Sequence, residues 1–296
     1  MLITTPNLEA LRTGFSALYQ GGLGEVESQY LQIATEVPST TSENTYGWLG
    51  KLPNMRKWIG SRTIQAIMEH DYSIKNDDYE LTVSVERNHI KDDNLGIYNP
   101  LFTEMGRSTG AHPDQMCFGA LAAGFDEPCY DGQYFFDTDH PVIGEDGSTT
   151  TISNTAGGTG PAWFLIDDAR AIKPIIYQNR EAPQFVAMDN PTDPNVFNNK
   201  QFVYGVDGRN NTGYGFWQFA YGSKQPLNAS NYEAARVALG NMIGDHGRKL
   251  GIKGRLLVVP QQLEGAAREI LSAERNTAGA TNIWQGTARM MLADWL

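Results

Sequence analysis

The sequence predicts a mixed α+β fold, and three segments carry this prediction. Residues 79–86 alternate strictly between apolar and polar side chains, which is typical of a half-buried β-strand. Apolar side chains recur with a helical period across residues 99–125. Residues 256–259 form a continuous apolar run, and an amphipathic helical pattern follows over residues 263–271. A strand that leads directly into a helix indicates a compact α/β unit in the C-terminal half of the chain.

The N-terminal segment predicts a short amphipathic helix. Asn7 is a good N-cap for it, and Gly21-Gly22 is a good stop signal. Between them the apolar side chains form a narrow stripe at helical spacing, composed of Leu8, Leu11, Phe15 and Leu18. Such a stripe needs a second surface, which belongs either to the same domain or to a neighbouring subunit. The residues that follow, 23–45, are polar and irregular in pattern.

Extended structure is favoured from residue 46 to residue 87. One face of the strand at 79–86 carries its apolar side chains, which are Tyr79, Leu81, Val83 and Val85. The sequence KNDD at residues 75–78 is typical of a turn. Residues 63–74 are therefore expected to pair back as the other arm of a hairpin.

The segment 99–125 predicts a long helix. Asn99 is its expected N-cap, and Pro100 is its first helical residue, where proline sacrifices no internal hydrogen bond. Pro113 is expected to kink this helix or restart it, because its ring removes an amide donor from the helix interior. Residues 126–160 are rich in glycine and polar side chains and are expected to be loops.

The C-terminal half continues with alternating strand and helix signals. Residues 202–204 suggest a strand, and residues 207–211 (DGRNN) suggest a turn. Ser230 and Glu233 form a capping box that opens a helix. One side of this helix is apolar, with Tyr232, Ala235, Leu239, Met242 and Ile243.

Composition excludes several classes of protein. With 296 residues, 41% hydrophobic and 19% charged, the chain can build one large or two modest globular domains and is not disordered. Its net charge of −11 argues against a protein that grips nucleic acid by its phosphates. If the protein encloses DNA, it surrounds the DNA without binding the phosphates. The N-terminus lacks a signal-peptide layout, and no apolar stretch approaches a membrane span, so we expect a soluble protein that is not exported.

The two cysteines give no disulfide framework. Cys117 and Cys129 are interpreted as reduced, buried side chains in a protein assembled in the cytosol. The sequence contains no phosphate-binding loop and no HExxH, CxxC or GxSxG motif. We therefore predict no catalytic site and no cofactor.

One short cluster is a candidate for metal chemistry. Asp137, Asp139 and His140 lie close together, and carboxylates with a histidine can bind a divalent metal and activate water. The favoured alternative is that the two aspartates cap a turn before Pro141. On this interpretation no residue is assigned to a metal.

Aromatic and basic side chains interleave in one segment of the first third of the chain. The candidate contact residues are Trp48, Lys51, Arg56, Trp58 and Arg62. Stacking on nucleic-acid bases is one interpretation of this pattern. The acidic net charge favours the other, a contact between subunits, because Trp and Arg are enriched in the residues that dominate interface energies.

The same segment carries a family resemblance. Residues 44–65 (NTYGWLGKLPNMRKWIGSRTIQ) resemble the major head subunits of phage Mu and Mu-like prophages. The likeness continues in order through residues 92–98 (DDNLGIY), 104–107 (EMGR), 128–133 (PCYDGQ), 135–137 (FFD), 140–141 (HP), 173–178 (KPIIYQ), 204–206 (YGV), 215–218 (GFWQ), 250–253 (LGIK), 256–260 (LLVVP) and 295–296 (WL). It therefore spans nearly the whole chain.

Those head subunits are similar to the wider tailed-phage group with the Hong Kong ninety-seven capsid fold. The resemblance implies an N-terminal arm, an extended β-hairpin loop, a peripheral domain with a spine helix, and an axial α/β domain. Laid on this sequence, these parts occupy residues 1–45, 46–78, 79–159 and 160–280, with a C-terminal return segment at 281–296.

The resemblance also implies a function. The chain is expected to be a major capsid protein that assembles, as hexamers and pentamers, into an icosahedral virion shell around double-stranded DNA, without sequence-specific DNA binding and without a membrane. A scaffolding protein and a portal are implied as assembly partners in the bacterial cytoplasm, with a decoration protein as an optional further one. The alternatives are a phage tail or baseplate protein and a soluble metal-dependent hydrolase.

Overall fold

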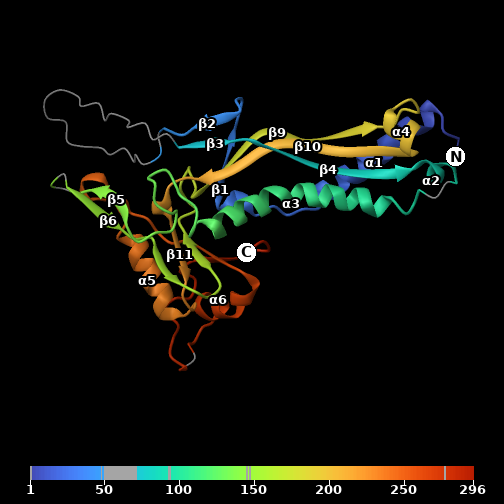
Figure 1. The fold of residues 1–296 in the computed structure, drawn as a ribbon. Helices are drawn as coiled ribbons and strands as arrows, with labels where there is room; N and C mark the ends of the chain where they lie inside the picture. Colours follow the sequence, from blue (N-terminus) through green and yellow to red (C-terminus); the bar gives the residue numbers. More distant parts are fainter. Residues whose placement is uncertain are drawn as a thin grey trace.

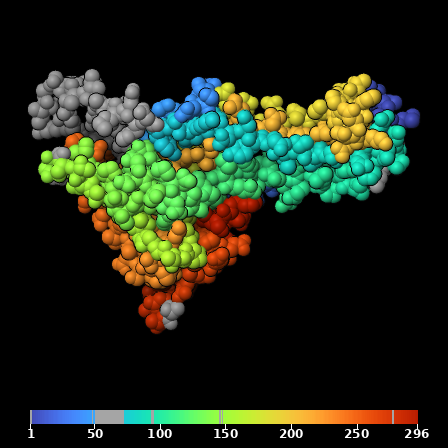
Figure 2. All heavy atoms as spheres, viewed as in Figure 1, coloured from blue at the N-terminus to red at the C-terminus, as the bar shows by residue number. Residues whose placement is uncertain are grey.

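The chain forms an elongated region joined to a compact one. The computed structural model describes residues 2–47, 49, 72–92, 95–144, 146, 148–276 and 278–296. In the elongated region, long strands run beside the helices α1 and α3, whereas the compact region tapers away from one end of α3 and contains α5 and α6 (Figure 1). Figure 2 shows the same outline with all atoms drawn. No helix in the described part of the chain is both long and apolar enough to cross a bilayer.

The elongated region is built on a sheet with long central strands, here called sheet I. Its strand order is β1-β9-β10-β4, with bounds Ala34–Pro38, Ile175–Met188, Gln201–Tyr214 and Asp77–Glu86. β10 runs antiparallel to both of its neighbours, and β1 runs parallel to β9. The helices of this region are α1 (Thr5–Gly24), α2 (Arg87–Lys91), α3 (Asn99–Ala123) and α4 (Pro194–Asn199).

The compact region is built on a sheet of short strands, here called sheet II. Its order is β15-β14-β8-β11-β7, with bounds Arg289–Leu292, Leu256–Val259, Trp163–Ile166, Ala220–Lys224 and Thr155–Gly158. The helices α5 (Ala229–Gly240) and α6 (Glu264–Leu271) pack beside it. β8 and β14 are buried along their whole length, which explains their continuous apolar sequence.

Short elements connect these parts. The hairpins are β2 (Glu43–Thr45) with β3 (Ser73–Lys75), β5 (His140–Ile143) with β6 (Thr149–Ile152), and β12 (Ile243–Gly244) with β13 (Arg248–Lys249). The 3₁₀ turns are η1 (Tyr30–Gln32), η2 (Trp217–Phe219), η3 (Asp245–Gly247) and η4 (Gln261–Leu263).

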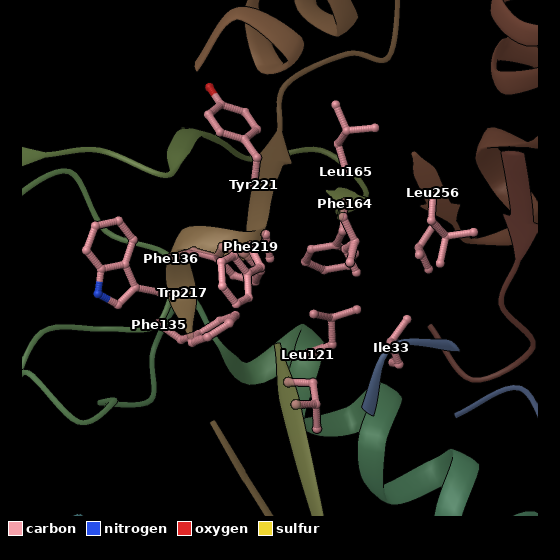
Figure 3. Packing of buried hydrophobic residues seen from close by; sticks show 14 of the residues in the cluster. Ile33, Leu121, Phe135, Phe136, Phe164, Leu165, Trp217, Phe219, Tyr221 and Leu256 are labelled. Atoms are coloured by element: carbon pink, nitrogen blue, oxygen red, sulfur yellow. The ribbon is translucent and has the colours of Figure 1, made fainter. Parts of the chain in front are cut away.

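The helix α3 contributes to both buried cores. Its N-terminal half supplies Phe102 and Met105 to a core shared with α1 and sheet I. Its C-terminal half supplies Phe118 and Leu121 to a larger core that continues into sheet II. Figure 3 shows aromatic side chains from several segments gathered around Leu121 at this junction. One continuous helix therefore ties the two regions together.

The helices α1 and α3 approach each other closely enough to exclude side chains. A Cβ atom at Gly106 of α3 would overlap the carbonyl oxygen of Tyr19 and lie 2.7 Å from the backbone nitrogen of Leu23. A Cβ atom at Gly22 of α1 would lie 3.1 Å from the Cα atom of Thr103. Glycine at these positions therefore permits backbone contact between the two helices.

Several local predictions are confirmed. The strand at 79–86 is part of β4, residues 202–204 belong to β10, and residues 256–259 are β14, followed by α6. The long helix is confirmed over Asn99–Ala123, but its predicted N-cap is wrong: Tyr98 is the N-cap, and Asn99 is the first helical residue. The helix runs through Pro113 without restarting.

Other local predictions are wrong, and tertiary contacts explain each. The first helix has Thr4 and not Asn7 as its N-cap, and it continues through Gly21-Gly22, where Gly22 packs on α3. Its buried stripe faces its own subunit, which is one of the two alternatives left open. Residues 207–211 lie inside β10, where a bulge accommodates them between two paired strands. Residues 23–45 contain β1 and β2, and residues 126–160 contain β5, β6 and β7.

Both sheets combine strands from distant parts of the chain. β9 and β10 lie within residues 160–280, yet they pair in sheet I with β1 and β4. Within 281–296, β15 forms the edge of sheet II beside β14. Asp294 and Trp295 then line a surface depression together with Arg107 of α3. Each region is therefore assembled from separated stretches of chain.

The start of α5 offers a test of how this helix is capped. The side chain of Asn228 accepts a hydrogen bond from the Asn231 amide at 2.9 Å, so the cap lies before the predicted Ser230–Glu233 box. We expect Asn228→Ala to lower the free energy of unfolding by about 1 kcal/mol. Urea denaturation measures this loss. Ser230→Ala is the control and should change stability little; a larger loss in that variant would contradict the assignment.

Candidate functional site

The predicted contact residues lie outside the described part of the chain. These are Trp48, Lys51, Arg56, Trp58 and Arg62. The structure does describe both ends of the segment that carries them. β2 leads into the segment and β3 follows it, and the two strands pair antiparallel, with Glu43 opposite Lys75 and Thr45 opposite Ser73. The two ends of the segment therefore lie side by side, at a place here called the loop base.

A buried polar network fixes the loop base to sheet I. Its centre is Gln178 of β9, whose side chain is fully buried. The hydroxyl of Tyr46 donates to Oε1 of Gln178 at 2.8 Å. Nε2 of Gln178 donates to the carbonyl oxygen of Ile74 at 3.0 Å and to Oδ1 of Asn76 at 2.7 Å. Both ends of the segment thus share one anchoring side chain.

Further contacts extend this network. Nδ2 of Asn76 donates to the hydroxyl of Ser39 at 3.0 Å and to the carbonyl oxygen of Thr41 at 2.9 Å. The backbone amide of Tyr214 donates to the hydroxyl of Tyr72 at 2.7 Å. Burial raises the pKa of Tyr72 to about 12, against the opposing effect of that hydrogen bond, so the hydroxyl stays protonated as a structural group.

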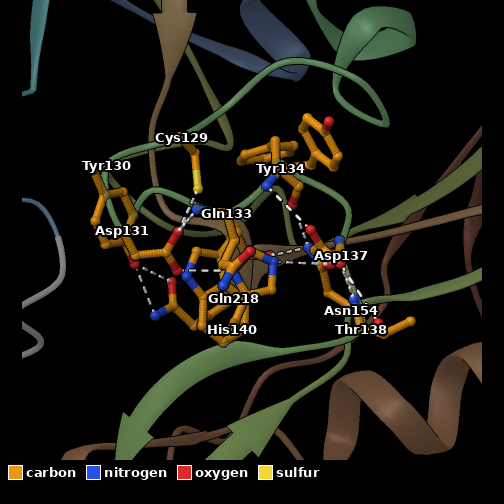
Figure 4. Close-up of polar contacts among 12 residues, drawn as sticks. Cys129, Tyr130, Asp131, Gln133, Tyr134, Asp137, Thr138, His140, Asn154 and Gln218 are labelled. Atoms are coloured by element: carbon orange, nitrogen blue, oxygen red, sulfur yellow. Dashed lines mark hydrogen bonds and ion pairs between the residues drawn. The ribbon is translucent and has the colours of Figure 1, made fainter.

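A second cluster lies where the loop after α3 meets the first strand of the β5–β6 hairpin (Figure 4). Sγ of Cys129 lies 3.1 Å from Oδ1 of Asp131, and Nδ1 of His140 lies 2.8 Å from Oδ2 of Asp131. Burial raises the pKa of Asp131, but the hydrogen bond and charge of His140 outweigh it and leave the pKa below its usual value. Burial, and then the charge of Asp131, raises the pKa of the Cys129 thiol.

The imidazole of His140 is held on its other sides as well. Its Nε2 atom lies 3.2 Å from Oδ1 of Asn154, and its ring stacks on Trp217 with centroids 3.9 Å apart and planes 9° apart. Nδ2 of Asn154 donates to the carbonyl oxygens of Phe135, at 2.8 Å, and of Trp217, at 3.3 Å. These contacts join three segments around a fully buried histidine.

The predicted trio of Asp137, Asp139 and His140 does not form a ligand set, because His140 turns toward Asp131 and Asn154. Asp137 accepts hydrogen bonds from the amides of Tyr134, at 3.2 Å, and Thr138, at 2.7 Å, so it caps a turn, as the alternative interpretation held. A hydrogen bond to Asp137 raises the pKa of the exposed Asp139 carboxyl.

The sequence analysis missed Cys129 and Asp131 as partners of His140. The available signal was an aspartate two residues after a cysteine, with a histidine nine residues further on.

The fold identifies the class of protein. The structure is similar to the procapsid subunit of bacteriophage JBD30, with a TM-score of 0.87 and 45% sequence identity over 99% of this chain and 100% of that chain. It is also similar to a JBD30 capsid decorated with minor capsid protein trimers, with a TM-score of 0.79 and 35% identity over the whole of both chains. The predicted tailed-phage capsid fold is therefore confirmed.

The family follows from the sequence. Residues 8–296 match the family described as Mu-like prophage major head subunit gpT. The chain is 42% identical to the major capsid protein of Escherichia phage Mu over the whole of both chains. It is 46% identical to the Mu-like prophage FluMu major head subunit of Haemophilus influenzae, over 93% of this chain and 92% of that protein. The chain belongs to the Mu-like major head subunit family, and its role is that of a structural capsid subunit and not of an enzyme.

Proposed function

We propose that this head subunit forms the hexamers and pentamers of an icosahedral shell, with a scaffolding protein and a portal taking part during assembly. The observation that carries the proposal is the full-length match to subunits that form a procapsid and a capsid. Rings of head-to-tail contacts that close by symmetry give stable shells from modest interfaces. The net charge of −11 supports a shell that surrounds DNA without binding its phosphates.

The shell proposal is tested by imaging. The subunit is co-expressed with the scaffolding protein of its own phage, purified, and examined by negative-stain electron microscopy. We expect closed shells of uniform size. Tubes would favour the alternative of a tail protein, and subunits that stay monomeric at high concentration with scaffold present would contradict assembly.

We further propose that the part of the predicted 46–78 loop between Tyr46 and Tyr72 extends across a neighbouring subunit, with Trp48, Lys51, Arg56, Trp58 and Arg62 making the contact. Residues 73–75 and 77–78 stay in β3 and β4 of this subunit. The loop base supports this proposal, because Gln178 hydrogen-bonds to Tyr46 at one end of the segment and to Ile74 and Asn76 at the other. A rigid base reduces the entropy lost when the segment binds a partner. The aromatic and basic side chains are of the types that dominate interface energies.

Replacing Trp58 with alanine tests the loop contact. We expect the variant to fold but to give far fewer closed shells with scaffold present, because a buried aromatic anchor at an interface commonly contributes about 2 kcal/mol or more. Electron microscopy measures shell yield, and circular dichroism checks the fold. Trp295→Ala, which removes a partly exposed tryptophan elsewhere, is the control. Normal shell yield for Trp58→Ala would remove the claim.

The two regions suggest a division of roles. We propose that the elongated region with α3 is the peripheral domain and that the compact region with sheet II is the axial domain.

Cys117 and Cys129 are buried free thiols, which is the state that a reducing bacterial cytoplasm maintains. This state supports assembly in that compartment. The likeness to a capsid decorated with minor capsid protein trimers supports a decoration protein as an optional partner.

A further inference from the structure

The side chains of Cys129, Asp131 and His140 bring three metal-binding atom types to one point. Their ligand atoms all lie within 4.8 Å of one another. Cys129 and His140 are buried, and the side chain of Asp131 is 8% exposed. The first two ligands in sequence, Cys129 and Asp131, come from the loop after α3, and the third opens β5 (Figure 4). A shell subunit without a catalytic role needs no such group for chemistry.

The distances in the cluster fit a small tetrahedral cation. With metal–ligand bonds of about 2.0–2.3 Å, neighbouring ligand atoms of a tetrahedral zinc site lie about 3.3–3.6 Å apart. Sγ of Cys129 lies 3.1 Å from Oδ1 of Asp131, Nδ1 of His140 lies 2.8 Å from Oδ2 of Asp131, and the ligand atoms of the three side chains all lie within 4.8 Å of one another. Side-chain rotations that place Sγ, Nδ1 and one carboxylate oxygen at the tetrahedral separations would form the site.

The surroundings of His140 select the nitrogen that faces the cluster. Asn154 uses both hydrogens of its Nδ2 on backbone carbonyl oxygens, so its Oδ1 must accept from Nε2 of His140. Nε2 therefore carries a hydrogen, and Nδ1 shares a second hydrogen with Asp131. When that hydrogen leaves, Nδ1 presents its lone pair toward Cys129 and Asp131. The stack on Trp217 fixes the plane of the ring. Metal-binding histidines characteristically donate their second nitrogen to an oxygen in this way.

We propose that Cys129, Asp131 and His140 bind one zinc ion, with a water molecule as the fourth ligand. A thiolate and a carboxylate together neutralise the two positive charges, so the occupied site adds no net charge to the interior. As the ion enters, one proton leaves the Cys129 sulfur and one leaves the hydrogen bond between His140 and Asp131. The ion replaces these two protons as the link between the three side chains.

The bound ion would act as a structural staple. It joins the loop that leaves α3 to β5, close to the aromatic core where the two regions meet. Neither Asp137 nor Asp139 takes part, because Asp137 caps a turn and the Asp139 carboxyl is exposed. Zinc is favoured over calcium or magnesium, because those ions prefer sites made only of oxygen ligands.

The first test uses the unaltered subunit and needs no mutation. The purified protein is treated with a chelator, dialysed, and titrated with Co²⁺ as a spectroscopic substitute for Zn²⁺. We expect an equimolar complex with a thiolate-to-cobalt absorption band and the visible bands of tetrahedral cobalt, both of which disappear when zinc is added. A folded protein that shows neither band, and that retains no zinc after expression in zinc-supplemented medium, would overturn the proposal.

Variants then locate the ion. Cys129→Ala and His140→Gln should each reduce equimolar zinc binding to background and abolish the thiolate band. Cys117→Ala is the matched control, because it removes the other buried cysteine, which lies in α3 outside the cluster. Undiminished cobalt absorption in Cys129→Ala, or equal loss in Cys117→Ala, would refute the assignment. Chelation should also lower the melting temperature of the unaltered subunit but leave that of Cys129→Ala unchanged.

Discussion

Replacing Gly106 with alanine should prevent the subunit from folding stably. The added Cβ would overlap the carbonyl oxygen of Tyr19, which belongs to the backbone of α1 and cannot rotate away. The two helices would have to move apart, and this would disrupt the stacking of Phe15 of α1 on Phe102 of α3. We expect a loss of more than about 3 kcal/mol, at or beyond the upper end of overpacking effects. Urea denaturation, or the yield of soluble protein, measures it.

Gly14→Ala is the matched control for this prediction. Gly14 lies in α1, and a Cβ atom there meets nothing within 4 Å. Because alanine has the higher helix propensity, this variant should gain about 0.5–1 kcal/mol. A Gly106→Ala subunit as stable as the unaltered protein would show that α1 and α3 do not make the backbone contact described.

Replacing Gln178 with leucine should release the loop base. The leucine has nearly the same volume but leaves Oδ1 of Asn76 and the carbonyl oxygen of Ile74 without the donor they share. Each buried polar group that loses its partner costs about 1–3 kcal/mol, so the two groups together should cost about 2–6 kcal/mol. Chemical denaturation measures this loss, and hydrogen exchange at residues 72–76 shows whether it is local.

The same variant links the loop base to assembly. Since Gln178 contacts both ends of the segment, its loss should also reduce the yield of closed shells. Gln184→Leu is the control, because Gln184 lies on the same strand and is exposed. If Gln178→Leu retained full stability, or if both variants lost it equally, the proposed role of the buried network would be wrong.

The sequence predicted those elements whose signal is local. β4 alternates because one face is more buried than the other, and β14 is apolar throughout because sheet II buries it on both faces. The turn predicted at residues 207–211 failed because β10 is paired on both sides, and two ladders outweigh turn-forming side chains. β1 was missed because its partner, β9, is distant in sequence, and no local pattern records parallel pairing.

The candidate sites likewise separate into features with a local sequence signal and features that depend on contacts between distant segments. The resemblance located the segment at 44–65, but no sequence pattern predicted that Gln178 would anchor its ends. Asp137, Asp139 and His140 suggested a ligand set by adjacency alone, whereas the side chains of Asp137 and His140 bond to different neighbours. Asn154 and Trp217 orient His140 from separate segments, and such contacts follow only from the folded arrangement.

The continuity of α3 has a mechanical consequence. Its two halves are embedded in different cores, with Phe102 in one and Leu121 in the other. The two regions are therefore connected by a packed helix and not by a flexible linker. A change of angle between the regions would require bending this rod or sliding one set of packed side chains past another. We therefore expect adjustments of curvature in a shell to be taken up first at the contacts between subunits.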